Sequence, residues 1–470
     1  MHAAYNLPED VRHALQKAHH SEIKERPKYI LRKCIDNYNI SAQGTYPLCQ
    51  DTGTAMFFVD IGEDFPLKGN PTEAINEGMK RAYSEALLRK SLVSEPIFER
   101  KNTGDNTPAV IHYNFVKGNQ LAIHYLGKGG GTENCGTLGK LTPSQGERGV
   151  IDFVVDTVAK AGGKPCPPII VGVGAGNESE LLSKKALLRK IGNRHLNPKY
   201  AAMEEEILKR VNNLGIGPQG LGGKTTAMEV FFEYSAAHIA TMPIAVSINC
   251  HAVRRGSVIL THDNAAIRIE QMQKAEQIRE KLSAATPPPS VKHLTIPLGE
   301  SNAKALHAGD TVLLTGTLYV ARDAAHKRLQ TALENGEPLP FDINGSSIYY
   351  MGPTPAKGDN PIGSCGPTTS ERMDDYSESM LGGGLRAMIG KGPRSQETID
   401  LMVENGAVYF SAIGGAGAVY GECVKSSKVI AYEDLGAEAI LKLEVENFPA
   451  FVAIDSRGQT CMIKPERRAL

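Results

Sequence analysis

The side chains best suited to chemistry lie in residues 46–55, which read YPLCQDTGTA. This stretch places the thiol of Cys49 beside the amide of Gln50 and the carboxylate of Asp51. A core strand would exclude such a mixture, because every buried polar group needs a hydrogen-bond partner. A simple surface turn has no use for the cysteine. The stretch is therefore interpreted either as a chemical site or as an incidental loop composition, and the rest of the chain must decide.

The chain has eight cysteines, and none of them form a C-x-x-C pair, which disfavours a zinc ribbon or a thioredoxin-like motif. Cys166 is flanked by prolines in KPCPPII, and Cys250 ends an apolar run in SINCHAVRR. Iron–sulfur ligation requires thiolates on loops of this kind. A free cysteine is by default a small buried hydrophobic residue, however, and spacing alone does not select ligands here.

A third group of reactive side chains lies in GSCGPTTSERMDDY, residues 363–376. Arg372 follows Thr368 by one helical turn, and a helix starting here would surround the hydroxyl with free amides that favour an anion. The alternative is a threonine N-cap with a solvated arginine. Arg322 in VARDAAH and Lys391 in KGPRSQ add further cations. If these groups converge, the guanidinium forks favour a small dicarboxylate.

The elements that must position these side chains combine helix and strand patterns. Residues 149–163 predict a helix, residues 167–176 a buried strand, and Asn177 the N-cap of the next helix. A C-terminal helix is predicted over residues 322–336. Strands are predicted in the C-terminal part at 310–321, 346–352, 406–414 and 450–455. Both parts of the chain are therefore expected to be α/β, with a mixed α+β arrangement.

The turn GVGAG at residues 172–176 lies between a predicted strand and helix, as a dinucleotide-binding loop would. It lacks the full G-x-G-x-x-G pattern. The acidic residue required about 20 residues later falls in KIGNRHLNPKY, which has no strand pattern. We therefore expect a tight turn here and not a nicotinamide site.

A proline-rich connector predicts two domains. Residues 280–298 contain three consecutive prolines, which neither a helix nor a central strand tolerates. We predict an N-terminal domain over residues 1–283, a linker over 284–294 and a smaller C-terminal domain over 295–470.

Charge and hydropathy exclude several partners. The chain has 52 Lys plus Arg and 52 Asp plus Glu, so no global field draws in nucleic acid or an anionic membrane. No apolar run approaches the roughly 18 residues that span a bilayer. The N-terminal residues lack the apolar core of a signal peptide, and the scattered cysteines favour reduced thiols. A cytoplasmic location is therefore expected.

Eleven segments, in order from about residue 49 to 418, resemble the class I (iron–sulfur) fumarate hydratases and their relatives, the tartrate dehydratases and mesaconases. The segments are CQDTGTA, NTGDNTPA, KGGGTEN, CPPIIVGVGAG, GIGPQGLGGKTTA, INCHAVR, VARDAAH, YYMGPTP, GPTTSERMDDY, KGPRSQ and FSAIGGAGA. Ordered matches over most of the chain are more specific than any single motif. The chain looks like α- and β-type parts of the two-subunit form, fused at the proline-rich connector.

The resemblance implies a [4Fe-4S] cluster held by Cys49, Cys166 and Cys250, which leaves one iron open. Cys135, directly after GGGTEN, and Cys365, directly before GPTT, are interpreted as non-ligands.

The resemblance also assigns the substrate site, which we expect between the two domains. It implies catalytic roles for Thr368 in proton transfer at carbon, for Asp51 as a proton relay, and for His238 as a hydrogen-bond partner of the substrate. The implied substrate-binding residues are Gln50, Arg89, Gly131, Arg322, Arg372 and Lys391. Ser370 and Glu371 depart from the family pattern, and an added acid near a dianion bears on which substrate is bound.

The expected reaction is reversible hydration of fumarate to L-malate, with the open iron as Lewis acid. The same chemistry on mesaconate or L-tartrate is the alternative, and the sequence RMD after GPTT looks more like a fumarase. A non-catalytic iron–sulfur sensor or electron carrier is the second alternative. The expected partners are the small dicarboxylate and, from the resemblance, a second copy in a homodimer.

Overall fold

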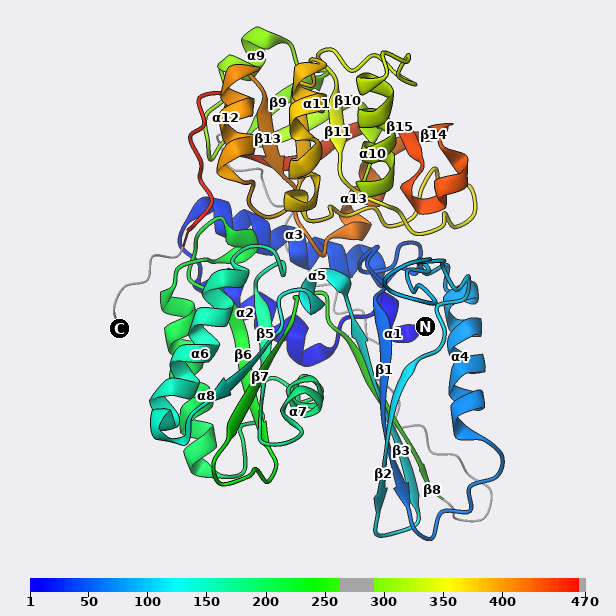
Figure 1. The fold of residues 1–470 in the computed structure, drawn as a ribbon, viewed down its shortest axis with the longest axis vertical. Coiled ribbons are helices and arrows are strands. Elements are labelled where there is room, and N and C mark those ends of the chain that lie inside the picture. The colour runs from blue at the N-terminus through cyan, green and yellow to red at the C-terminus, as the bar shows by residue number, and fades with distance from the viewer. Residues whose placement is uncertain (262–290, 465–470) are drawn as a thin grey trace.

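The computed structural model describes residues 1–261 and 291–464. The N-terminal part forms two lobes side by side, and the C-terminal part forms one domain that lies across both of them (Figure 1). The fold is mixed α/β, as predicted. Residues 284–290 of the predicted linker lie outside the described residues, and residues 292–294 belong to strand β9. The domain boundary at residue 283 stays a prediction.

The first lobe is a four-stranded sheet in the order β2-β1-β3-β8. Its strands are β1 (Thr54–Gly62), β2 (Val110–Val116), β3 (Gln120–Lys128) and β8 (Arg254–Thr261). β3 runs antiparallel to both β1 and β8, with Thr54 opposite Lys128 and Gly127 opposite Arg254. The start of β1, the end of β3 and the start of β8 therefore meet at one edge. Helix α4 (Pro71–Glu85) buries Met79 and Tyr83 in this lobe.

The second lobe is a four-stranded sheet in the order β4-β7-β5-β6. Its strands are β4 (Thr137–Leu141), β5 (Ile169–Ala175), β6 (Ala227–Tyr234) and β7 (Met242–Asn249). Its helices are α5 (Gly130–Glu133), α6 (Gly146–Ala161), α7 (Ser179–Ala186) and α8 (Pro198–Asn213). Ile170 pairs with Asn249, so the start of β5 lies beside the end of β7.

The helix and strand predicted in this lobe are confirmed, one cap is wrong, and the tight turn expected over residues 172–176 is confined to Gly176, because residues 172–175 belong to β5. The helix and strand predicted over residues 149–163 and 167–176 correspond to α6 and β5. The predicted N-cap at Asn177 is wrong, because α7 begins at Ser179 with Glu178 in the cap position. The backbone N–H of Asn177 instead donates to the carbonyl of Ala236.

The C-terminal domain is built on a seven-stranded sheet in the order β14-β15-β13-β12-β11-β10-β9. Strand β15 also pairs with β10, which closes β10, β11, β12, β13 and β15 into a ring. The strands are β9 (Lys292–Ile296), β10 (Thr311–Val320), β11 (Ser347–Tyr349), β12 (Ala387–Gly390), β13 (Val408–Ser411), β14 (Val424–Ala431) and β15 (Ile440–Ile454). Strands β9 to β13 are parallel, so their carboxyl ends share one edge.

The helices of this domain include the one predicted from sequence, and the four strand predictions are also met. The helices are α9 (Glu300–Lys304), α10 (Asp323–Glu334), α11 (Ser377–Gly382), α12 (Gln396–Glu404) and α13 (Gly417–Cys423). A 3-10 helix, η3 (Ser370–Tyr376), follows Thr369 where the hydroxyl-rich segment predicts a helix start.

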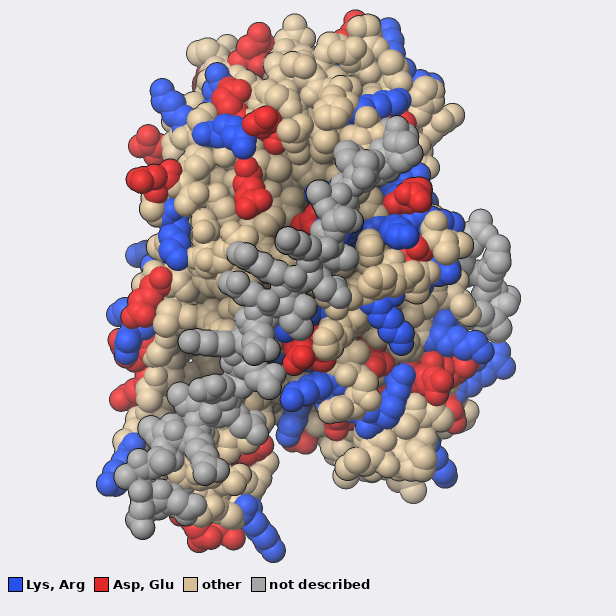
Figure 2. Space-filling model, turned by 180° about the vertical axis from the view of Figure 1, so that it is seen from behind, with Lys and Arg blue, Asp and Glu red and all other residues tan. Residues whose placement is uncertain are grey.

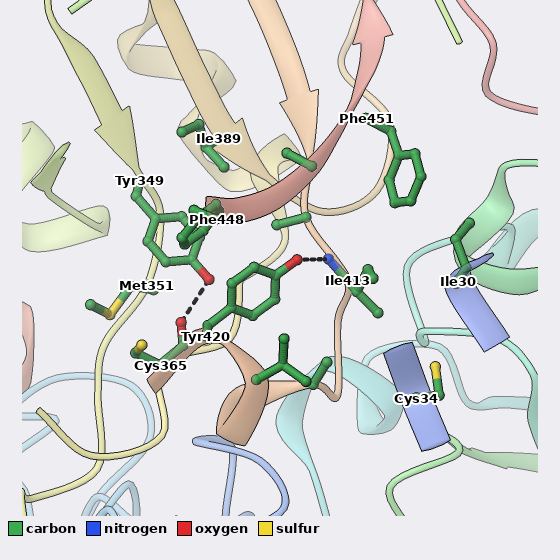
Figure 3. Close-up of a cluster of buried hydrophobic side chains, with 14 of the residues drawn as sticks. Ile30, Cys34, Tyr349, Met351, Cys365, Ile389, Ile413, Tyr420, Phe448 and Phe451 are labelled. Atoms are coloured by element: carbon green, nitrogen blue, oxygen red, sulfur yellow. Dashed lines mark hydrogen bonds between the residues drawn. The ribbon is translucent and has the colours of Figure 1, made fainter. Parts of the chain in front are cut away.

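The two parts of the chain share one hydrophobic core. The N-terminal helices are α1 (His2–Tyr5), α2 (Glu9–Ser21) and α3 (Glu25–Ser41). Helix α3 lies along the boundary in Figure 1, and its Ile30 and Cys34 belong to the same buried cluster as Tyr420 and Phe448 of the C-terminal domain (Figure 3). The rings of Tyr420 and Phe448 are 4.5 Å apart. Buried apolar area therefore fixes the position of one part on the other.

The surface carries no dominant charge on the face shown in Figure 2, where Lys and Arg lie among Asp and Glu. This mixture agrees with the equal counts in the sequence. Among the helices of the described residues, none is long and apolar enough to cross a bilayer.

Candidate active site

Three cysteines from distant parts of the sequence meet where the two lobes join. Cys49 precedes β1, Cys166 precedes β5 and Cys250 follows β7, and their buried side chains form one cluster with Ala252. Cys135 and Cys365 pack into other hydrophobic clusters. In residues 1–261 and 291–464, no three His, Cys, Asp or Glu side chains are arranged to hold a single metal ion.

Local backbone geometry presents the cysteines. Gly53 has φ +73°, and a Cβ there would lie 2.3 Å from the carbonyl oxygen of Lys128. Only glycine allows this turn, which directs residues 49–51 toward the neighbouring lobe. Cys166 itself has φ +58°, an uncommon value for a residue with a side chain. Such strained positions occur where surrounding structure demands one direction for a side chain.

Burial opposes ionisation of the three thiols, and a lysine offsets it. Burial raises the pKa of Cys49, Cys166 and Cys250. The ammonium of Lys391 donates to the Cys166 sulfur over 2.8 Å and to the carbonyl of Lys164 over 2.9 Å. Burial alone would lower the pKa of Lys391, but Cys166 and Asp51 hold it above its usual value. Lys391 is therefore charged at neutral pH.

Two glycines of the C-terminal domain allow the cysteine loops to approach its backbone closely. A Cβ on Gly414 would lie 2.3 Å from the Cys166 sulfur, and one on Gly366 would lie 2.5 Å from the amide oxygen of Gln50. The Gln50 amide nitrogen donates to the carbonyl of Pro367 over 3.3 Å. The cysteine loops thus pack directly against backbone of the other domain.

Asp51 lies among cations. One carboxylate oxygen accepts from the N–H of Gly131 over 3.4 Å, and the other is 3.6 Å from the guanidinium of Arg89. Burial alone would raise the pKa of Asp51, but Arg89, Arg254, Lys391 and the Gly131 N–H lower it. Asp51 is therefore ionised at neutral pH.

The C-terminal domain contributes its residues from the carboxyl ends of its parallel strands, where α/β sheets commonly bind ligands. Arg322 follows β10, and Lys391 follows β12. Thr368 donates its backbone N–H to the carbonyl of Tyr350, directly after β11. The Thr368 hydroxyl oxygen accepts a hydrogen bond from Arg372 over 2.8 Å.

Three guanidinium groups crowd this edge. Arg89 donates across the domain boundary to the carbonyl of Gly352 over 2.7 Å. Burial, with the nearby charges of Arg322 and Arg372, lowers the pKa of Arg89 to about 10. Arg322 pairs with Glu438 and Arg372 pairs with Asp323, and a dianion placed here would further offset the positive charge of the three arginines. The structure thus brings together every predicted site residue except one.

That exception is His238, whose predicted contact with the substrate does not form within one chain. His238 is exposed in the connection between β6 and β7, where its ring accepts from the N–H of Ala240. The whole length of β7, eight residues or roughly 25 Å, separates it from Cys250. The two residues lie at opposite ends of the same strand, and proximity in sequence does not show this.

The structure adds Asn106, which sequence reasoning did not assign. Its buried amide oxygen accepts from the N–H groups of Ser91 and Leu92 over 2.8 and 3.0 Å. Its amide nitrogen donates to the carbonyl of Gly53 over 3.1 Å. Asn106 therefore fastens the segment after Arg89 to the turn after Asp51. The segment NTGDNTPA carries it, but a sequence motif does not reveal what an asparagine joins.

The unusual pair Ser370 and Glu371 does not place a free acid at the site. Ser370 is buried and its hydroxyl bonds that of Tyr409 at 2.9 Å. Glu371 forms an ion pair with Lys164 of the N-terminal part at 2.5 Å. The added negative charge is therefore matched by a lysine across the domain boundary.

Comparison with known proteins identifies the family of this chain. A family model described as fumarate hydratase (fumerase) matches residues 1–259, and one described as fumarase C-terminus matches residues 260–464. Fumarate hydratase 1, mitochondrial, from Leishmania major is 32% identical over 96% of this chain and 87% of its own length. Fumarate hydratase class I, anaerobic, from Escherichia coli is 32% identical over 94% of this chain and 83% of its own.

A third relative matches about half of the chain. The putative L(+)-tartrate dehydratase subunit alpha of Methanocaldococcus jannaschii is 42% identical over 54% of this chain and 92% of its own length. The two family models together cover nearly the whole chain, and the two fumarate hydratases match it along almost all of its length. The chain therefore belongs to the class I fumarate hydratase family and is a hydro-lyase.

Proposed function

We propose that this protein reversibly adds water to fumarate to give L-malate. The observation that carries the proposal is the convergence of Arg89, Arg372, Lys391 and the Thr368 hydroxyl over three buried cysteines at the domain junction. A planar dicarboxylate suits this set, because guanidinium groups bind carboxylates through paired hydrogen bonds.

The site fits a [4Fe-4S] cluster held by Cys49, Cys166 and Cys250. Three buried thiols converge there, the Lys391 ammonium lies beside Cys166, and Gly414 lets the Cys166 sulfur lie close to the backbone of the C-terminal domain. When bound, such a cluster supplies a Lewis-acidic iron that polarises the water or hydroxyl of the substrate.

The cationic residues would bind the two carboxylates. Arg89 comes from the N-terminal part, while Arg322, Arg372 and Lys391 come from the C-terminal domain, where Arg322 pairs with Glu438 and Arg372 with Asp323. Gln50 and the N–H of Gly131 add neutral donors beside them. The same cations stabilise the extra negative charge that develops on one carboxylate when the adjacent carbon loses its proton.

Thr368 would move the proton at carbon. In the hydration direction its hydroxyl donates to the carbon next to a carboxylate, and in the reverse direction its oxygen accepts that proton. The hydrogen bond from Arg372 lowers the cost of negative charge on the Thr368 oxygen. Asp51, ionised between Arg89 and Gly131, would relay the proton to solvent.

L-tartrate is a second candidate substrate, because the relative that is 42% identical over 54% of this chain is named as an L(+)-tartrate dehydratase subunit. Protein purified without air should be assayed with fumarate, mesaconate and L-tartrate in parallel. We expect the highest kcat/KM with fumarate. Preference for L-tartrate would establish the second candidate, and intact cluster absorbance without turnover would indicate a sensor or electron carrier. Activity that survives bleaching of the cluster by oxygen would contradict the cofactor assignment.

We further propose that the protein acts in the cytoplasm as a homodimer. All eight cysteines are free, which agrees with a reducing compartment such as the cytoplasm. A homodimer follows from the family resemblance, and a second copy is the available source for the histidine expected near the substrate.

Asn106→Ala is expected to raise KM for fumarate about tenfold, because freeing two N–H groups loosens the segment that carries Arg89. Asn106→Asp keeps the hydrogen-bond acceptor but not the donor, and its KM should lie between those of the wild type and Asn106→Ala. Steady-state kinetics with cluster absorbance as a loading check measure this. Asn114→Ala, an exposed asparagine in the same lobe, is the control. An unchanged KM for Asn106→Ala would exclude a positioning role.

Glu371→Gln is expected to change KM for fumarate by less than roughly fivefold, because a partly exposed ion pair contributes little. Kinetics at two salt concentrations measure this, and Glu378→Gln on the next helix serves as a control. A drop in KM of tenfold or more would show that Glu371 repels the substrate, against the pairing with Lys164.

A further inference from the structure

A buried arginine beside the cysteines lacks hydrogen-bond partners. Arg254 begins β8 and is 3% exposed. Among the described residues, its Nε and Nη1 atoms have no hydrogen-bond partner. Burying a charged guanidinium in this state costs several kcal/mol, so an anion must compensate for it. Neighbouring Arg255 differs, since its guanidinium pairs with the carboxylate of Asp10.

Two glycines make room for the Arg254 side chain. Arg254 lies opposite Gly127 on the adjacent strand. A Cβ on Gly127 would lie 3.2 Å from the Arg254 Nε, and one on Gly129 would lie 3.5 Å from Nη2. Without side chains there, the guanidinium can lie along the end of β3. The Cys49 loop leads into β1 at the same end of the sheet.

The groups near Arg254 that can carry negative charge include two of the three clustered cysteines. Burial alone would lower the pKa of the Arg254 guanidinium, but negative charge on Cys49, Cys250, Tyr125 and Asp51 raises it. The carboxylate of Asp51 already has Arg89 and the Gly131 N–H as partners. Lys391 donates a hydrogen bond to the third cysteine, Cys166. Burial raises the pKa of Cys49 and Cys250, while Arg254 lowers the pKa of both and Lys391 also lowers that of Cys250.

We infer that Arg254 is the buried counter-ion of the iron–sulfur cluster and directs its free N–H groups at the sulfur ligands Cys49 and Cys250. This inference rests on the proposed cofactor. Arg254 acts through the cluster and does not contact the substrate. Net charge and hydrogen bonds to sulfur set the reduction potential of such clusters. A fixed positive charge favours the more negative, reduced form, so Arg254 raises the potential and helps to retain iron.

The test compares Arg254→Met and Arg254→Lys with the wild-type holoenzyme, all reconstituted without air. Electron paramagnetic resonance during a redox titration gives the cluster potential, and a chelator assay gives the iron release rate. We expect Arg254→Met to have a more negative potential and to release iron about tenfold faster. Arg254→Lys keeps the positive charge, so its cluster potential and iron release rate should be close to those of the wild type. Wild-type values for Arg254→Met would overturn the inference.

Controls separate this result from folding and from turnover. Arg255→Met removes the neighbouring buried arginine and should leave the potential unchanged, whatever it does to stability. If Arg254→Met does not fold, Arg254→Gln provides the same neutral comparison, and a wild-type potential there also overturns the inference. Neither readout involves a substrate. Failure to hydrate fumarate would therefore count against the proposed function and leave the role of Arg254 standing.

Discussion

Replacing Cys49, Cys166 or Cys250 with alanine is expected to remove bound iron and turnover together. Each thiol supplies one corner of a buried group of three, and within residues 1–261 and 291–464 this cluster contains no fourth thiol. Changes in the second coordination shell alone cost about 10–100-fold in metal affinity, so loss of a ligand should exceed about 100-fold. Iron and sulfide content per chain, with visible absorbance under nitrogen, measure the effect.

The remaining cysteines provide matched controls for this prediction. Cys135→Ala, Cys365→Ala and Cys461→Ala remove the same group from positions outside the cluster and should keep full iron content. Cys135 is the most demanding control, since its thiol bonds the carbonyl of Gly131 beside the site. Iron loss in Cys135→Ala, with retention in Cys49→Ala, would overturn the ligand assignment.

Thr368→Val is expected to lower kcat at least about 100-fold while the cluster stays intact. Valine keeps the shape of threonine but removes the hydroxyl, and general acid–base groups commonly contribute 10²–10⁴-fold. Binding of L-malate should persist, because the arginines and Lys391 remain. Single-turnover kinetics, together with the malate-induced change in the cluster spectrum, separate binding from proton transfer.

Two further variants test whether the hydroxyl itself is responsible. Thr368→Ser restores a hydroxyl at the same position and should recover much of the rate. Thr369→Val makes the same change one residue later, where the side chain caps no helix hydrogen bond, and should behave as wild type. A Thr368→Val enzyme within a few-fold of the wild-type rate would show that another group moves the proton.

Periodicity and motif content predict much of this fold, because the signals are local. The apolar spacing in residues 149–163 specifies a buried helix face, and it appears as α6. The three cysteines are identified only through family motifs, since residues 117 and 84 positions apart are joined by tertiary structure. The same limitation explains His238, because a motif gives its place along the chain but not the end of β7 at which it lies.

Other features depend on partners that a sequence does not show. Arg254 is one letter in INCHAVR, and its lack of hydrogen bonds is visible only in three dimensions. Asn106 gains its role from Ser91, Leu92 and Gly53, which reach it from two other loops. The cap predicted at Asn177 fails because Gly176, with φ +100°, sets the direction of the turn before the helix begins.

The core that α3 shares with the C-terminal domain has a consequence for assembly. In a protein made as separate subunits, covering Ile30 and its neighbours requires two chains to meet, at a rate that depends on how much of each is made. In this chain the same contact is intramolecular, with an effective concentration that can reach the order of millimolar. Equal supply of both halves of the site is therefore built into a single polypeptide.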